Sequence, residues 1–227
     1  MRVLIVAATR PEIEPLLSSI EAKADGDRAD DRILVGRTAG RQVDCLVTGV
    51  GMVATAVWCT RTLASGRYDL ALNLGVCGSF NAAYPPSSVV HVTSEMLPEL
   101  GAEDGARFLP MADIGLVGPD EFPWRGGRLI NSAPPTLPGL AALPSASGIT
   151  VNTVHGDDDS IARVAARCAP DVESMEGAAF MYACLVAGVP FAEVRAVSNV
   201  VERRNRAAWN LGGAMTRLNE TAVRLLS

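Results

Sequence analysis

Several residue types are scarce in this 227-residue chain, and each shortage excludes a kind of chemistry. The sequence has two histidines, His91 and His155, which excludes an HExxH zinc site. Lys23 is its single lysine and lies in the polar stretch EAKADGDRADD, which disfavours a phosphate-loop lysine and a Schiff-base lysine. Chemistry in this chain therefore has to use carboxylates, amides, arginines or the backbone.

Composition also limits the cellular compartment and the binding partners that we expect for this chain. The five cysteines are an odd number without CxxC spacing, so we expect a reduced, cytoplasmic environment. No basic segment with a cleavage site precedes the first apolar run, and every apolar run falls short of the ~20 residues that span a bilayer. The formal net charge of −5 provides no basic footprint, so we expect neither nucleic acid nor a membrane as partner.

Alternating strand and helix patterns predict an α/β fold. Buried strands are expected at residues 3–8, 32–36, 42–48, 70–74, 88–94, 149–154 and 191–197, and helices at 12–22, 51–63, 159–168, 175–186 and 205–226. Residues 97–147 are rich in proline and glycine and are interpreted as an elaborated loop region of one domain, residues 1–227. In such folds ligands bind at the carboxyl ends of strands.

Two strand ends near the N-terminus carry distinctive segments. In ATRPEIE, Glu12 lies at a helix start, where a charged carboxylate is either a general base or an ordinary first-turn residue. TGVGMVA matches the GxGxxG/A dinucleotide fingerprint, but the next strand ends in Asn73 and Leu74 instead of the expected acidic residue. We therefore favour a tight glycine turn that lets the backbone approach a ligand.

Three further segments offer polar groups or close backbone approach. NLGVCGS is interpreted as a glycine-containing loop after a strand. Glu176 in VESMEGAA opens an apolar helix, and its carboxylate can either accept two hydrogen bonds from a vicinal diol or simply suit the helix start. Asn199 in VRAVSN ends a buried strand, where its amide is either a ligand contact or a turn residue.

Together these segments resemble a known family. TGVGMVA, NLGVCGSF, VESMEGAA and VPFAEVRAVSN, in this order and spacing, resemble the nucleoside phosphorylase/nucleosidase superfamily, and within it the purine nucleosidases that split methylthioadenosine and adenosylhomocysteine. The resemblance covers residues 1–83 and 149–227. It implies a three-layer α/β/α sandwich with a mixed, partly barrel-like central sheet, a nucleoside as the small-molecule partner, a homodimer or larger assembly, and no required metal or organic cofactor.

The resemblance also implies roles for matched positions. Glu12 matches the general base that activates water. The residues implied to bind substrate are Met175 and Glu176 at the ribose, Cys77 and Gly78 along the purine, and Asn199 at purine N7, with Ser198 and Thr153 nearby; whether Thr153 or His155 contacts the purine is left open by the sequence.

Two departures from the family pattern carry information. Asn73 stands where family phosphorylases have a phosphate-binding arginine, which favours water as the nucleophile. Asn199 stands where adenine-releasing relatives have aspartate. An asparagine can donate to a 6-oxo group and accept from N7–H, and a site built for one such pattern can reject the other by about 10⁴. We therefore expect a 6-oxopurine leaving group, with hypoxanthine as the first candidate.

One subfamily, futalosine hydrolase of the alternative menaquinone route, combines these features. The chain is also similar to it in SEMLPELGAEDGARFLPMADIGL and SNVVERRNRAAWNL. Its substrate is an inosine-like nucleoside with a carboxyphenyl ketone beyond the 5′ carbon, and such a benzoate suits an arginine fork. Arg204 and Arg206 are candidates, Arg204 preferred from the family pattern, although both also suit a solvated helix start.

Other functions stay open at this point. They are a nucleosidase acting on methylthioadenosine or adenosylhomocysteine, an inosine phosphorylase, a catalytically silent nucleoside-binding protein, and a nicotinamide oxidoreductase that rests on GVGMVA alone.

Overall fold

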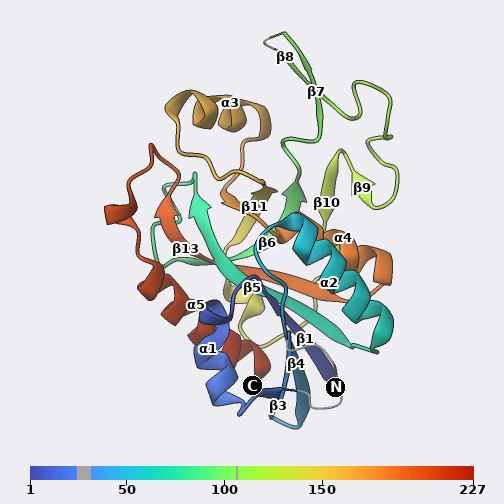
Figure 1. The fold of residues 1–227 in the computed structure, drawn as a ribbon, viewed down its shortest axis with the longest axis vertical. Coiled ribbons are helices and arrows are strands. Elements are labelled where there is room, and N and C mark those ends of the chain that lie inside the picture. The colour runs from blue at the N-terminus through green and yellow to red at the C-terminus, as the bar shows by residue number, and fades with distance from the viewer. Residues whose placement is uncertain (25–31, 106) are drawn as a thin grey trace.

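A computed structural model describes residues 1–24, 32–105 and 107–227, and its centre is a mixed β-sheet with helices on both faces (Figure 1). The sheet comprises β1 (Arg2–Ala7), β2 (Lys23–Ala24), β3 (Ile33–Thr38), β4 (Arg41–Val47), β5 (Leu70–Ser79), β6 (Val89–Met96), β9 (Trp124–Arg125), β10 (Arg128–Ile130), β11 (Ser145–Thr150), β12 (Val172–Ser174) and β13 (Phe191–Val200). The strands β7 (Gly101–Asp104) and β8 (Arg107–Pro110) form a separate antiparallel pair.

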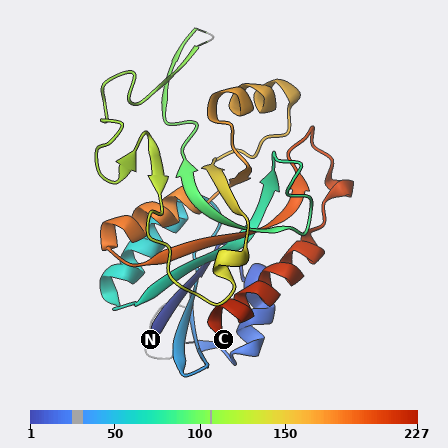
Figure 2. The same ribbon diagram turned by 180° about the vertical axis from the view of Figure 1, so that it is seen from behind.

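The helices are α1 (Arg10–Ser19), α2 (Met52–Ser65), α3 (Asp158–Cys168), α4 (Gly177–Ala187) and α5 (Leu211–Leu226), with short 3₁₀ turns at Leu140–Ala142 and Arg206–Ala208. α1 packs with α5 on one face of the sheet, and α2 packs with α4 on the other (Figures 1 and 2). α4 (GAAFMYACLVA) is apolar on nearly all sides because it lies between α2 and the sheet. The three-layer arrangement predicted from the family resemblance is confirmed.

Five strands close into a ring, which makes the sheet partly a barrel. β5 pairs with β12, β12 with β11, β11 with β6, and β13 pairs with both β6 and β5. Beyond the ring, β5 continues through β1, β4 and β3 to β2, while β6 continues to β10 and β9. Within the ring, β12–β11, β11–β6 and β13–β5 are parallel pairs, whereas β5–β12 and β13–β6 are antiparallel. The sheet is therefore mixed, as predicted.

The prediction of a loop over NLGVCGS is wrong, because these residues belong to β5. The strand is paired with β13 along its whole length and with β1 and then β12 on its other edge. Its glycines do not form a turn; they are needed because side chains of other residues pack directly against the strand. A Cβ on Gly75 would lie 2.2 Å from Arg195 Nη1, and one on Gly78 would lie 2.8 Å from Val201 Cγ2. These glycines therefore mark close packing of side chains over a strand.

Several predicted boundaries also need correction. The strand expected at 149–154 is β11, Ser145–Thr150, whose small residues gave a weak apolar signal but pair with β6 and β12. The helix expected from 205 begins at Leu211, because the side chain of Asn210 caps it by accepting from Gly213 N at 3.0 Å. The helix expected from 175 begins at Gly177, with Glu176 as its N-cap.

Residues 97–147, interpreted as an elaborated loop region, contain β7 to β10 and the turn Leu140–Ala142 between their loops. β12, a strand of three residues, was not predicted. None of the helices in the described part of the chain is long and apolar enough to cross a membrane.

Candidate active site

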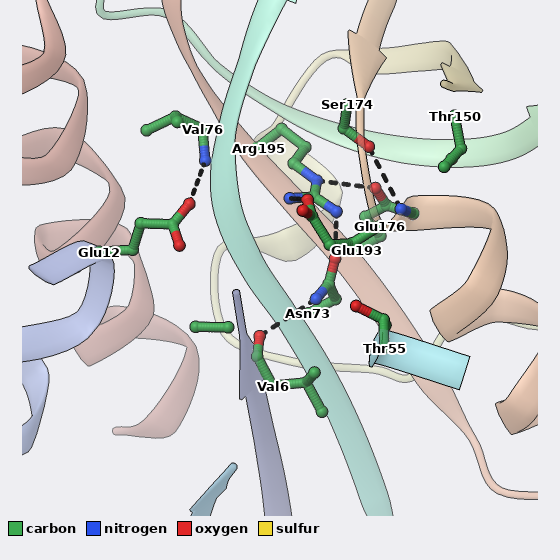
Figure 3. Close-up of polar contacts among 12 residues, drawn as sticks. Val6, Glu12, Thr55, Asn73, Val76, Thr150, Ser174, Glu176, Glu193 and Arg195 are labelled. Carbon is green, nitrogen blue, oxygen red and sulfur yellow. Dashed lines mark hydrogen bonds and ion pairs between the residues drawn. The ribbon is translucent and has the colours of Figure 1, made fainter. Parts of the chain in front are cut away.

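The carboxylate of Glu12 is fixed at the start of α1. Thr9 is the N-cap of this helix, and Glu12 at the third helical position completes a capping box with it. Glu12 Oε2 accepts from the backbone N and from Oγ1 of Thr9, both at 2.8 Å. Its Oε1 accepts from Val76 N on β5 at 3.2 Å (Figure 3). Three donors therefore hold this buried carboxylate beside β5.

Arg195 of β13 is buried at the centre of a polar cluster (Figure 3). Its Nε donates to Glu193 Oε1 at 2.8 Å, one terminal nitrogen donates to Asn73 Oδ1, and Nη1 lies 3.7 Å from Glu176 Oε2. Burial alone opposes the charge, but the carboxylates of Glu193 and Glu176 raise the pKa of Arg195 above its usual value. The guanidinium therefore stays charged and compensates the acidic groups around it.

Glu176 connects α4 to the glycine turn between β4 and α2. Its Oε1 accepts from Gly51 N at 3.0 Å. Gly49 and Gly51 have φ values of +90° and +97°, which confirms the predicted tight glycine turn in TGVGMVA. With Oε2 facing Arg195, both oxygens of Glu176 are oriented by groups from other elements.

The carboxyl groups of Glu95 and Glu193 lie next to each other beneath the start of α4. A Cβ on Gly177 would lie 2.3 Å from Glu95 Oε1 and 2.5 Å from Glu193 Oε1, so glycine is required there. Thr150 Oγ1 donates to Glu95 Oε2 at 2.9 Å. Burial and then repulsion by Glu193 raise the pKa of Glu95 well above its usual value. Burial therefore favours the protonated form of Glu95, and Glu95 Oε1 and Glu193 Oε2 have no hydrogen-bond partner among the described residues.

A second group of side chains gathers around Gly78 on β5. The register places Asn199 of β13 beside Gly78 on one edge and Glu173 of β12 beside it on the other. A Cβ on Gly78 would lie 3.4 Å from Asn199 Nδ2 and 3.7 Å from Glu173 Cγ. A register shift adds Ser198 to β13 just before Asn199, and such a bulge re-aims the following residue.

Neighbouring groups fix the Asn199 amide. Ser198 Oγ lies 2.8 Å from Asn199 Oδ1 and 3.1 Å from Cys77 O, and Asn199 Nδ2 donates to Val200 O at 2.9 Å. Burial raises the pKa of the Cys77 thiol to about 12, so this thiol stays protonated. Cys77 therefore packs at the site and is not a nucleophile.

The remaining predicted substrate contacts lie around these two groups. Met175 is half-buried between β12 and α4, next to Glu176. Thr153 is exposed in the connection 151–157. Arg204 is exposed, its guanidinium lies 5.6 Å from the Trp209 ring centroid, and its backbone N donates to Gly156 O at 3.2 Å. The structure thus brings the segment after Asn199 against the connection 151–157.

Four charged residues of the site were missed at the sequence level: Glu95, Glu173, Glu193 and Arg195. A signal was present in FAEVRAV, where two charges alternate within a buried apolar strand and so point to the same side. Among the described residues, no group of three or more histidine, cysteine, aspartate or glutamate side chains is arranged to hold a metal ion.

The ring of five strands with helices on both faces is the nucleoside phosphorylase fold. The chain matches the crystal structure of a 5′-methylthioadenosine/S-adenosylhomocysteine nucleosidase from Colwellia psychrerythraea in complex with adenine, with a TM-score of 0.81 at 20% identity over 100% of this chain and 94% of that one. A family model described as the phosphorylase superfamily matches residues 2–227, and the chain belongs to this superfamily.

Two relatives share more of the sequence. A futalosine hydrolase from Streptomyces coelicolor is 33% identical over 195 residues, which cover 80% of this chain and 77% of the relative. A futalosine hydrolase from Acidothermus cellulolyticus is 31% identical over 230 residues, which cover 98% of this chain and 89% of the relative.

Proposed function

We propose that this protein is a purine nucleosidase that hydrolyses futalosine to hypoxanthine and dehypoxanthine futalosine, a step of the alternative menaquinone route. The observation that carries the proposal is the asparagine amide at Gly78, held by Ser198 and Val200 at the strand end. An amide at this position pairs with a 6-oxopurine better than with a 6-aminopurine. The two futalosine hydrolases at 31–33% identity support the same substrate.

Water is the proposed nucleophile, and Glu12 is its general base. Glu12 takes a proton from water as the oxygen attacks the anomeric carbon, a role that typically contributes about 10²–10⁴ in rate. The position of Asn73 supports water over phosphate: its Nδ2 donates to Val6 O at 3.1 Å and its Oδ1 accepts from Arg195. The charge of Arg195 is already compensated by Glu193 and Glu176.

Glu176 is the proposed partner of the ribose hydroxyls. Its carboxylate accepts hydrogen bonds from the vicinal diol and places negative charge near the sugar, where positive charge develops as the glycosidic bond breaks. Arg195, at 3.7 Å, holds Glu176 in place as a positioning residue. Cys77, Gly78 and Met175 would line the nucleoside.

At the two ends of the substrate we assign Asn199 and Arg204. Asn199 donates to O6 and accepts from N7–H of the departing base, while Ser198 orients the amide. Arg204 is the proposed partner of the substrate benzoate, because its exposed guanidinium offers a fork of donors beside the connection that contains Thr153.

One experiment separates this proposal from its competitors. Purified protein is incubated with futalosine, inosine and 5′-methylthioadenosine, with and without phosphate, and the released base is identified by chromatography. We expect hypoxanthine from futalosine at the highest kcat/KM, independent of phosphate. Preferential adenine release would identify a methylthioadenosine nucleosidase, phosphate dependence a phosphorylase, and hypoxanthine binding without turnover a silent binding protein.

A further inference from the structure

The departing purine needs a proton that the groups assigned so far do not supply. When the bond between C1′ and N9 breaks, its electron pair moves into the purine, and the charge is relieved by protonation of the ring. An asparagine amide is not an acid, so Asn199 orients the base without protonating it. A titratable group within reach of N7 would supply this proton.

The structure holds such a group in a carboxylate–imidazole pair next to Gly78. His155 Nδ1 lies 2.6 Å from Glu173 Oε2, and the backbone N of His155 donates to Glu173 Oε1 at 3.0 Å. Since a carboxylate accepts, Nδ1 carries the hydrogen, and Nε2 is the ring nitrogen left for another partner. The Phe80 ring packs edge-on against the imidazole, with centroids 6.3 Å apart. The pair is therefore built and oriented before any substrate arrives.

The position of this pair relative to Asn199 follows from the strand order. Glu173 and Asn199 are the two neighbours of Gly78, and side chains of both approach the point where its Cβ would lie. Val201 Cγ2 lies nearest to that point, at 2.8 Å, so a purine that approaches β5 here would lie against Val201. The N7 edge of such a purine would lie between the amide of Asn199 and the pair of Glu173 and His155. We propose, on the basis of the proposed function, that His155 is the general acid that protonates the leaving purine through Nε2.

The surroundings suit an acid that must be recharged in every cycle. The side chains of His155 and Glu173 are 14% and 4% exposed. His155 also lines a surface hollow of about 400 Å³, through which solvent can return a proton. The charged residues that line this hollow with His155 are Glu99 and Glu103, from the segment between β6 and β8, and Arg163 and Arg167 from α3. Burial raises the pKa of Glu173, and its hydrogen bond to His155 opposes this rise.

The reaction balances without any other reactant. The proton on His155 Nε2 moves to purine N7 as the bond between N9 and C1′ breaks, Asn199 Oδ1 accepts from the new N7–H, and hypoxanthine leaves neutral. Water adds to C1′ and gives its proton to Glu12. The enzyme then has neutral His155 and protonated Glu12, and exchange with solvent restores both.

The test compares two leaving groups in the variant H155Q, which retains a hydrogen-bond donor but cannot give up a proton. The substrates are futalosine and 4-nitrophenyl β-D-ribofuranoside, whose phenolate leaves without protonation. We expect kcat/KM of H155Q to fall by about 10²–10⁴ on futalosine and by less than about threefold on the nitrophenyl riboside. A loss by the same factor on both substrates, or by less than about threefold on futalosine, overturns the assignment.

Two further variants provide the second measurement. E173Q weakens the acceptor that orients the imidazole, so it should lower kcat/KM on futalosine more than on the nitrophenyl riboside. H91Q, at the other histidine, which lies on β6, is the matched control and should keep the wild-type kcat/KM on both substrates. An H91Q enzyme as impaired as H155Q also rejects the role.

These outcomes are independent of the substrate assignment. If the wild type cleaves inosine or 5′-methylthioadenosine but not futalosine, the proposed function fails, and the H155Q comparison is made on the nucleoside that is cleaved. If H155Q and the wild type then behave alike, the acid assignment fails as well.

Discussion

Replacement of Glu12 by glutamine tests the proposed mechanism most directly. The wild-type carboxylate accepts from Thr9 N, Thr9 Oγ1 and Val76 N, at 2.8, 2.8 and 3.2 Å. Glutamine has one acceptor oxygen, so E12Q loses part of the capping box, which costs about 1 kcal/mol of stability. For a protein with at least about 5 kcal/mol of stability, more than about 99% of the variant stays folded at 25 °C.

Catalysis should suffer far more than folding. An amide cannot take a proton from water, so we expect kcat to fall by about 10²–10⁴ while Tm falls by about 2–4 °C. The assay is the initial rate of hypoxanthine release from futalosine at 25 °C, with thermal unfolding measured on the same sample.

The same substitution two residues away provides the control. The Glu14 side chain is 49% exposed on the same helix and pairs with Arg10 at 2.6 Å. E14Q should therefore keep wild-type kcat. An E12Q enzyme within about tenfold of wild type, or an E14Q enzyme as impaired as E12Q, would refute Glu12 as the base.

Three further predictions concern selectivity, the substrate tail and stability. N199D should shift the ratio of kcat/KM for futalosine and its 6-amino analogue by about 10² or more toward the amino compound, and an unchanged ratio contradicts our account of base selection. R204Q should lower kcat/KM on futalosine about tenfold but not on inosine, which lacks the carboxylate; R206Q is the control, and equal effects of both variants would argue against Arg204. Burial raises the pKa of Glu95, so the folded state takes up a proton and its stability falls as pH rises above the unfolded value of about 4.3. E95Q cannot ionise, so thermal unfolding at pH 8 should give a Tm about 2–4 °C above wild type with a flatter pH dependence, and an unchanged pH dependence would contradict the raised pKa of Glu95.

The sequence predicts the layers of this fold because its central elements carry strong local signals. VLIVAA in β1 and the apolar α4 are long enough to be recognised without knowledge of their partners. β12 has three residues, and its strand character depends on pairing with β5 and β11, which no local pattern reveals. The glycines of β5 were misinterpreted for the same reason: the side chains that fill their space come from other strands.

The residues of the candidate site also fall into a group that the sequence predicts and a group that it does not. Glu12, Glu176 and Asn199 were predicted from family motifs, and their catalytic roles stay predictions. The cluster around Arg195 was not predicted, because Glu95 and Glu193 meet only when β6 and β13 close the ring beneath α4. Such contacts depend on strands that are distant in the chain.

Gly75 sets a limit on how this enzyme can diversify. A single added methyl group there would lie 2.2 Å from Arg195 Nη1 and 3.2 Å from Glu12 Oε1, so even alanine displaces groups on both sides of the strand. Random mutagenesis should therefore yield few active clones with changes in β5. New substrate ranges would have to be selected from libraries in exposed connections, such as residues 152–154 and 202–208, where the side chains face solvent.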